Sequence, residues 1–483
     1  MCLSSVERNH AGHKCVYVIL VQKLIMKIQY NSKVVIIGAG LTGLVTAHYL
    51  VKSGMSVTLV EKGTRPGGVI QSIKEHGFTI EAGPNTGVVS YPEIAELFDD
   101  LAGSCKMTIA NPQAKKRLIW KDGKWHVLPS GIIDWISTPL FTFWDKLKLL
   151  GEPFRKKGTN PDESIAGLAL RRLGKSLLDY AVDPFISGIY AGDPRSLVTR
   201  FALPRIYNLE QTYGSIIGGT IKKSTKPKGE RLKKATREVF SAEGGLQNLI
   251  DALVKSIGEE NILLDCQNVV VEPEQKGFQI SLVKHGETIN LKAERVVSTV
   301  GGKQIEALLP FIERGYLHAI GNLEYAKVVQ VAMGYKQWKG INTSAFGGLV
   351  PTIENRRILG ILFPSSIFNG RAPKDGALLS VFLGGIKNGE YFNLNNEEIK
   401  TLVDEEVGEL LHVKGIKPDL FRIFRYQHAI PQYTITSEQR LNAIEFIQHV
   451  YPGLVLAGNI NDGIGMGDRI KQARGVAEKI INC

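Results

Sequence analysis

The sequence contains few cysteines and no long hydrophobic segment, and both absences narrow the classes of protein to consider. Its five cysteines are scattered through 483 residues and include no C-x-x-C pair. We therefore expect neither a disulfide framework nor a zinc or other metal site, and a reducing compartment is the natural interpretation. No apolar run reaches the roughly 18 residues that a membrane-spanning helix needs. Any membrane contact must then be peripheral.

The overall composition is that of a globular protein with a basic balance. Hydrophobic residues make up 43% and charged residues 22% of the chain, which disfavours disorder. The chain is longer than a single hydrophobic core usually supports, so we expect two or three lobes. Lys and Arg outnumber Asp and Glu by 59 to 47, for a formal charge of +12. This excess favours an anionic partner, which could be a membrane surface, a nucleic acid or an acidic substrate.

Residues 1–29 are interpreted as a non-native or dispensable extension. Their one apolar patch, CVYVILV, is too short to span a bilayer, and no small-residue cleavage site follows it. Met26 lies just before KIQYNSKVVII, which would make a compact domain start.

A glycine-rich stretch, GAGLTG at 38–43, lies between an apolar strand at 34–37 and a helical pattern over 41–53. A second apolar run, SVTLV, leads to Glu61. Strand, turn, helix, strand and terminal acid together form the fingerprint of a dinucleotide site.

Each residue of this fingerprint has a physical task. Gly38 permits the tight turn, Gly40 lets the backbone approach a pyrophosphate, and Gly43 lets helix and strand pack closely. Glu61 is placed to bond the two ribose hydroxyls, which favours an unphosphorylated ribose. NAD and FAD both remain open at this point.

The residues after Glu61 favour FAD. EKGTRPGGVIQS contains Arg65, Gly67 and Gly68 and resembles the R-x-G-G extension of glutathione-reductase-like and amine-oxidase-like flavoproteins; GFTIEAGPN at 77–85 continues the pattern. Near the other end, a strand at 454–457, a glycine-rich loop and a last helix follow one another. The buried face expected for this helix comprises Ile470, Ala473, Ala477 and Ile480. Its N-terminus would place a partial positive charge beside the flavin.

The middle of the chain carries a more specific resemblance. FISGIYAGDP at 185–194, FGGLVP at 346–351, LGILFPSSIFNGRAP at 359–373 and LLSVFLGG at 378–385 together resemble the protoporphyrinogen oxidase family. The similarity covers the chain from about Lys33 onward. It implies an α/β fold that combines a Rossmann-like FAD-binding domain of the glutathione-reductase type, a mixed-sheet substrate domain and a helical membrane-facing lobe.

The resemblance also implies functional residues. Those that would contact FAD are Gly38, Gly40, Leu41, Thr42, Gly43, Glu61, Lys62, Arg65, Gly67, Gly68, Gly83, Val269, Asn459, Gly463, Ile464 and Met466. The FAD should be non-covalent, because no Cys or His lies near Asn459 or Gly68, where covalent relatives attach theirs. Arg117 matches an arginine that binds a substrate carboxylate, and the apolar walls of the slot match Leu349, Leu362 and Phe382. Gly188 matches a catalytic position whose carbonyl faces the macrocycle.

The activity implied is the oxygen-dependent oxidation of protoporphyrinogen IX to protoporphyrin IX, by repeated hydride transfer to FAD. The cofactor carries the difficult step, so no catalytic triad or carboxylate pair is needed. Three alternatives stay open: a coproporphyrinogen III oxidase, which would need cations for two further propionates; an amine oxidase or carotenoid desaturase; and a lipid carrier without redox activity on the same fold.

Two segments suggest contact with an anionic membrane. Residues 131–157 mix aromatic and basic side chains on short helices, and residues 222–237 hold eight Lys or Arg against one Glu. Nucleic acid is disfavoured, because no stacking aromatic residues are interleaved in the basic segment. We expect a cytoplasmic protein that lies peripherally on the cytoplasmic face of the membrane. A homodimer is left open.

The expected layout is discontinuous. The FAD domain would use 30–104, 235–305 and 430–483, the substrate domain 105–120 and 306–429, and the helical lobe 121–234.

Overall fold

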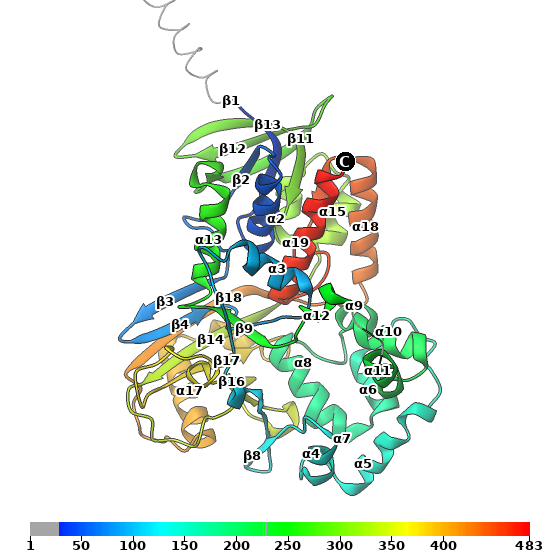
Figure 1. The fold of residues 1–483 in the computed structure, drawn as a ribbon, viewed down its shortest axis with the longest axis vertical. Coiled ribbons are helices and arrows are strands. Elements are labelled where there is room, and N and C mark those ends of the chain that lie inside the picture. The colour runs from blue at the N-terminus through cyan, green and yellow to red at the C-terminus, as the bar shows by residue number, and fades with distance from the viewer. Residues whose placement is uncertain (1–28, 226, 228) are drawn as a thin grey trace, which may run out of the picture.

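The computed structural model describes residues 29–225, 227 and 229–483. Residues 1–28, nearly all of the expected extension, lie outside the described residues, and Gln29 begins strand β1. Within the described part of the chain, no helix is both long and apolar enough to cross a bilayer. Figure 1 shows one large sheet above another, with a group of short helices beside the lower one.

The upper sheet is built on parallel strands. Its strands run in the order β10 (Ile262–Leu263), β2 (Val57–Val60), β1 (Gln29–Ile37), β13 (Glu287–Ser298), β12 (Phe278–Lys284) and β11 (Gln267–Pro273), and β19 (Leu454–Leu456) pairs with the end of β13. β1 is parallel to β2 and β13, and β13 is parallel to β19. Val34–Ile37 are at most 4% exposed, as expected of a strand with helices on both faces.

Helices cover both faces of this sheet. One face carries α2 (Leu41–Lys52), α3 (Pro92–Asp100), α13 (Gln247–Ile257) and α19 (Met466–Ile481), and the other carries α14 (Ile305–Leu308), α15 (Arg314–Gly321) and α18 (Ser437–Val450). The buried face predicted for the last helix is confirmed, since Ile470, Ala473, Ala477 and Ile480 are at most 3% exposed. This face packs α19 against α2, so the two ends of the described chain share one core.

The lower sheet is mixed. Its order is β18 (Leu420–Pro431), β14 (Tyr325–Tyr335), β17 (Ala377–Gly384), β16 (Gly360–Leu362), β15 (Gly347–Leu349), β7 (Arg117–Lys121) and β8 (Lys124–Val127). All neighbours are antiparallel except β15 and β7. Helix α17 (Asn396–Leu410) packs on one face over an apolar cluster. β8 falls within 121–234, which we expected in the helical lobe, because a tight turn returns the chain to pair with β7.

The remaining strands link the two sheets. The hairpin of β3 (Gln71–Glu75) and β4 (Phe78–Ala82) reaches from the first sheet to the second, and β5 (Gly87–Val88), β9 (Val239–Ala242) and β6 (Met107–Ile109) form a small sheet of their own. Helix α16 (Pro364–Ile367) follows β16.

Short helices form the lobe at the lower right of Figure 1. They are α4 (Ile132–Ser137), α5 (Phe143–Leu150), α6 (Ile165–Arg172), α7 (Lys175–Leu177), a π-helical turn (Leu178–Val182), α8 (Asp183–Ile189), α9 (Thr199–Ala202), α10 (Pro204–Tyr213) and α11 (Ile216–Ser224). The next helix, α12 (Glu230–Lys233), lies apart from them beside α3. A buried ion cluster holds the lobe together, because the fully buried Arg172 Nε lies 3.2 Å from Glu152 and 3.0 Å from Glu210. The predicted α/β fold with a mixed second sheet is confirmed.

Candidate active site

The glycine turn after β1 is closed by backbone contact between helix and strand. A Cβ on Gly43 would lie 1.9 Å from the carbonyl oxygen of Gly38, so only glycine allows α2 to begin this close to β1. Leu41 and Thr42 are buried in the first turn of α2. The helix N-terminus at Gly40 has no side-chain cap. Its first N–H groups are therefore available to an anion.

Glu61 lies at the end of β2, as the motif predicts. Its carboxylate accepts hydrogen bonds from the Ala39 N–H at 2.7 Å and the Gly63 N–H at 2.8 Å. The next residue, Lys62, is exposed, and its carbonyl accepts a bond from Gln267 at 3.1 Å. That bond brings the start of β11, including Val269, beside the end of β2.

The loop that follows Glu61 lies over the glycine turn. The Gly67 N–H donates to the Ala39 carbonyl at 2.8 Å, and a Cβ on Gly68 would lie 3.3 Å from the Gly40 Cα. Arg65 donates to carbonyls of its own loop, including those of Gly68 at 2.8 Å and Ile70 at 2.9 Å. In this structure the Arg65 guanidinium therefore shapes the loop.

Gly83 ends the β3–β4 hairpin and is held by the lower sheet. Its N–H donates to the Gln330 side-chain oxygen at 3.0 Å, and the Gln330 amide donates to the Glu81 carbonyl at 2.7 Å and to Ser380 Oγ at 2.8 Å. Gln330 is 1% exposed. This buried amide fixes the turn of the upper domain directly to the lower sheet.

The C-terminal loop, between β19 and α19, carries the last of the predicted cofactor residues. The Tyr433 hydroxyl donates to the carbonyls of Asn459 at 3.1 Å and Gly463 at 2.8 Å, and burial raises the pKa of Tyr433. The Asn459 side chain accepts a bond from Tyr325 at 3.2 Å. Ile464 packs against the helical lobe, and Met466 begins α19 in the upper core.

These segments meet at one edge of the upper sheet. The loops after β1, β2 and β19 all leave the carboxyl ends of strands that run parallel, directly or through β13. That edge is where open α/β sheets bind ligands. The structure thus brings the predicted cofactor residues of the first motif, the Glu61 loop and the C-terminal loop together, and Gln330 adds Gly83 from the hairpin.

Strand register places all four predicted substrate residues on one face of the lower sheet. Opposite one another across neighbouring strands lie Arg117, Gly347, Leu362 and Ser380, and in the next row Leu349, Gly360, Phe382 and Gln330. Directly paired residues share a face of a sheet. The other face holds Leu118, Ile361 and Val381, which pack under α17.

Burial singles out the same three wall residues. β15 and β16 are each buried except for their last residue, Leu349 and Leu362, and β17 is buried except for Phe382. Partial exposure at these positions indicates that the three apolar side chains border open space. Gly188 of α8 lies directly against this wall, because a Cβ there would lie 2.4 Å from Leu349 Cδ2.

Arg117 lies at the far end of this face. Its guanidinium stacks over the Phe346 ring at 5.3 Å, and no carboxylate of the described residues lies within ion-pairing distance. Arg117 is exposed at the start of β7, and partial desolvation by its neighbours lowers the pKa of its guanidinium. Four strand spacings separate β7 from β14, so Arg117 and Gln330 are about 19 Å apart across the sheet. A guanidinium without a counter-charge at that position can bind a carboxylate.

Two observations test whether the residues present fit a dinucleotide flavin. A Cβ added to Gly40 would meet no protein atom within 4 Å, so there is open space at the α2 N-terminus. Asn85 is 8% exposed, yet its side-chain oxygen has no partner among the described residues while its amide donates to the Gly83 carbonyl at 3.1 Å. A buried acceptor without a donor fits a ligand N–H at this place.

Comparison with known proteins shows which family the chain belongs to. The family described as flavin containing amine oxidoreductase matches residues 41–481. The chain belongs to this flavin-containing family. A protoporphyrinogen oxidase of Arabidopsis thaliana is 30% identical over 94% of both chains, and the coproporphyrinogen III oxidase of Bacillus subtilis is 25% identical over 92% of this chain and 97% of its own.

The resemblance predicted from the sequence is thereby confirmed. A crystal structure from an Exiguobacterium species, assigned provisionally as a protoporphyrinogen oxidase, superposes with a TM-score of 0.77 at 24% identity, covering 94% of this chain and 99% of that one. At this identity the likeness shows the fold. Membership of a flavin family, together with the dinucleotide turn at 38–43, makes the chain an FAD-dependent oxidoreductase.

Sequence reasoning missed two residues of this site. Asn85 lies within GFTIEAGPN, a segment that carried the resemblance, and the motif itself could have nominated it. Gln330 is the one amide in the apolar strand KVVQVAMGY. An isolated amide in a buried strand has to find partners, and that was the available signal.

Proposed function

We propose that this protein oxidises protoporphyrinogen IX to protoporphyrin IX, with FAD as the hydride acceptor and oxygen as the final oxidant. The observation that carries the proposal is the row of Leu349, Gly360, Phe382 and Gln330, which joins the wall of the apolar face to the Gly83 turn. Leu362 lies on the same face of the sheet, and Gly188 packs against Leu349.

When bound, the flavin would accept a hydride, and the residues of the chain would hold the flavin and the substrate in place. Gly38, Gly40, Gly43 and the α2 N-terminus would hold the pyrophosphate, Glu61 the ribose, and Asn85 the ring system, without a covalent bond. The apolar side chains of Leu349, Leu362 and Phe382 would exclude water from the macrocycle and hold its plane. Arg117 would fix one end of the substrate through a carboxylate. The carbonyl of Gly188 would face the reacting carbons.

The cations on the slot favour a dicarboxylate over a tetracarboxylate. Among the eight residues named in the two rows of the lower sheet, Arg117 is the one cationic side chain, and Arg422, where the first row reaches β18, is paired with Glu75. Two propionates at one end of a macrocycle suit a single guanidinium. Two more would meet apolar walls, where an unpaired carboxylate is costly.

Side-by-side turnover of the two porphyrinogens, followed by porphyrin fluorescence, tests this choice. We expect a higher kcat/KM for protoporphyrinogen IX than for coproporphyrinogen III. A higher kcat/KM for coproporphyrinogen III would contradict the proposal and favour the alternative hypothesis of a coproporphyrinogen III oxidase.

We also propose that the protein lies on the cytoplasmic face of an anionic membrane through helices α4 and α5. Their exposed apolar side chains are Ile133, Ile136, Phe143, Trp144, Leu147 and Leu150, and Phe154 just after them is 90% exposed. A dense exposed patch of this kind, with Lys148 and Lys156 beside it, suits insertion into one leaflet. Phe141, expected in the same surface, is instead 3% exposed in the lobe core.

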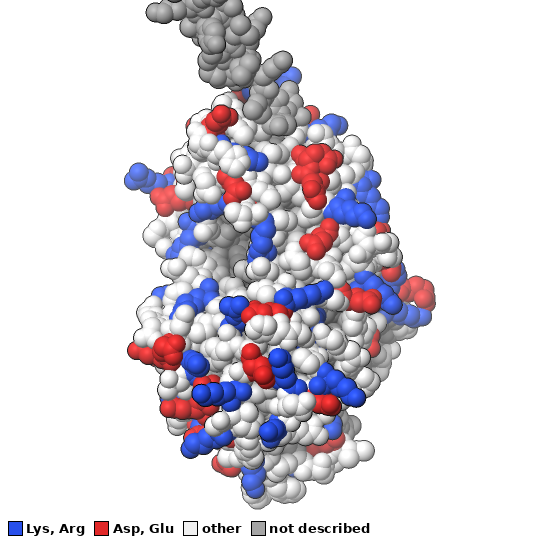
Figure 2. All heavy atoms as spheres, turned by 90° about the vertical axis from the view of Figure 1, so that its left-hand side faces the viewer, with Lys and Arg blue, Asp and Glu red and all other residues white. Residues whose placement is uncertain are grey.

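The basic segment 222–237 contributes less to membrane contact than its composition suggests. Arg231 pairs with Glu93 and Glu96 of α3, and Lys234 pairs with Asp99. These ion pairs bind α12 to the upper domain and neutralise part of its charge. On the face of the molecule that Figure 2 shows, basic and acidic side chains are intermixed.

A further inference from the structure

A buried carboxylate at the start of α8 joins the helical lobe to two loops of the lower sheet. Asp183 is 6% exposed. Its carboxylate accepts bonds from the Thr352 N–H at 2.8 Å and hydroxyl at 3.1 Å, and from Lys387 Nζ at 2.6 Å. Lys387 also donates to Thr352 Oγ1 at 2.8 Å. We refer to Asp183, Thr352 and Lys387 as the clasp.

The clasp connects three of the segments that carry the predicted slot residues, those of Gly188, Leu349 and Phe382. Thr352 lies three residues after Leu349, Lys387 lies five after Phe382, and Asp183 lies five before Gly188. A change in the clasp is therefore transmitted over a short length of chain to Gly188, Leu349 and Phe382.

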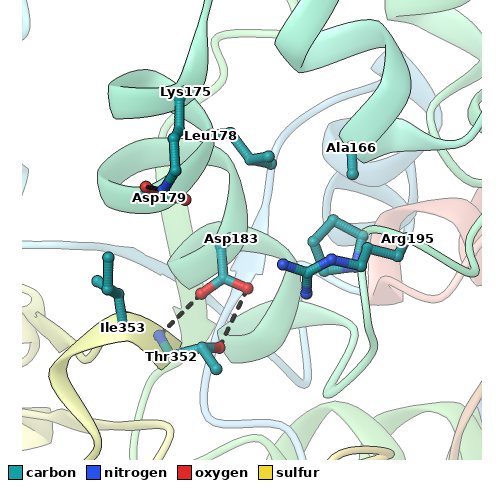
Figure 3. Close-up of a pocket in the computed structure, with 9 residues that line it drawn as sticks. Ala166, Lys175, Leu178, Asp179, Asp183, Arg195, Thr352 and Ile353 are labelled. Atoms are coloured by element: carbon teal, nitrogen blue, oxygen red, sulfur yellow. Dashed lines mark hydrogen bonds and ion pairs between the residues drawn. The ribbon is translucent and has the colours of Figure 1, made fainter.

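Little apolar packing supports the clasp. A cavity of about 190 Å³ on one side is lined by Asp183, Thr352 and Leu178, among others (Figure 3). A second cavity of about 240 Å³ is lined by Thr352, Lys387 and Ser187, among others. Because open space flanks the clasp, hydrogen bonds hold the first turn of α8 to the sheet, whereas Gly188 farther along the helix packs directly against Leu349. One backbone bond, from the Ile386 N–H to the Ala191 carbonyl at 2.8 Å, assists them.

An irregular helical turn comes just before the clasp. Residues Leu178–Val182 form a π-helical turn between α7 and α8. The extra residue of such a turn rotates the following helix by about 100° relative to a regular α-helix. In this orientation Asp183 faces Thr352, and Gly188 faces Leu349.

We propose that the clasp is a positioning device for substrate: it sets the distance between α8 and the lower sheet and thereby the width of the slot at Gly188 and Leu349. This role rests on the function proposed above. The three residues do not touch the reacting atoms; they act through the walls that they hold.

The test compares Asp183→Asn, Lys387→Met and the double variant, all as FAD-loaded full-length protein. For each single variant we expect KM for protoporphyrinogen IX to rise about tenfold, with kcat changed less than about threefold and flavin content unchanged. The double variant should be no worse than the worse single one, because both remove the same interaction. Lys387→Arg, which keeps the charge, should recover most of the affinity.

Glu163→Gln is the matched control. It breaks the partly buried ion pair of Glu163 with Arg171 in the same lobe, so a general loss of lobe stability would appear in it too. We expect its KM to stay at the wild-type value. If Glu163→Gln raises KM as much as Asp183→Asn does, the clasp has no special part in positioning.

Hydrogen–deuterium exchange separates failure of this proposal from failure of the function. Without any substrate, Asp183→Asn should speed amide exchange of residues 183–189 about tenfold, and Glu163→Gln should not. Unchanged exchange there overturns the clasp even if wild-type protein oxidises no porphyrinogen. Faster exchange with an unchanged KM in an active enzyme overturns its role in substrate positioning.

Discussion

Replacing Gly40 with alanine isolates the space that we assign to the FAD pyrophosphate. Gly40 has φ −71° and ψ 179°, a conformation that alanine adopts freely, and the new Cβ would meet no protein atom within 4 Å. The protein should therefore tolerate the change, at a cost of about 0.5–1 kcal/mol for the altered helix cap. Bound cofactor should not tolerate it. Forcing a methyl group into an occupied site costs about 1–3 kcal/mol, so FAD should bind roughly 5- to 150-fold more weakly.

The assay is calorimetric titration of FAD into apoprotein, with denaturant unfolding of the same apoprotein. Gly43→Ala is the contrasting variant, because its Cβ would lie 1.9 Å from the Gly38 carbonyl oxygen, so it should lose both stability and FAD. Gly475→Ala, in open space on α19, should bind FAD normally and gain up to about 1 kcal/mol of stability. If Gly40→Ala binds FAD as the wild type does, the pyrophosphate does not lie at this turn.

Three further predictions concern the slot, the membrane and acid stability. Arg117→Ala should raise KM for protoporphyrinogen IX roughly 10- to 150-fold by removing a charged hydrogen bond, with unchanged flavin content; unaltered steady-state kinetics would remove Arg117 from the site. Trp144→Ser with Phe154→Ser should abolish most binding to anionic vesicles in a sedimentation assay, whereas Leu232→Ser, 56% exposed on α12, should not; equal effects would contradict the α4–α5 surface. Burial raises the pKa of Glu210, but its bonds from Arg171 outweigh this and lower the pKa below the usual value. Ionised Glu210 thus stabilises the fold above its unfolded pKa of about 4.3, and this contribution is lost as the pH falls through the folded value. Glu210→Gln should therefore flatten the acid side of the curve of stability against pH, and an unchanged slope would refute this assignment.

Local patterns made much of the upper domain predictable. The helix expected over 41–53 runs from Leu41 to Lys52, and the strand expected over 454–457 runs from Leu454 to Leu456. The period of apolar residues also gave the buried face of α19. Such features depend on neighbours within a few residues, which a sequence displays directly.

Features that depend on distant partners were not predictable in this way. The basic character of 222–237 suggested a free surface, but Arg231 and Lys234 find their partners on α3, more than a hundred residues earlier. The tie between Gln330 and Gly83, and the register that aligns Arg117 with Leu362, are likewise set by strand pairing across long stretches of chain. Resemblance nominated the slot residues, and only the folded sheet shows that they share a face.

Anaerobic mixing of the purified flavoprotein with protoporphyrinogen IX tests the central claim most directly. A slot of apolar walls beside a bound flavin predicts rapid bleaching of the oxidised flavin absorbance, followed by porphyrin fluorescence and by recovery of the flavin colour when oxygen is admitted. A flavin that stays oxidised in the presence of saturating protoporphyrinogen IX and coproporphyrinogen III would contradict the account.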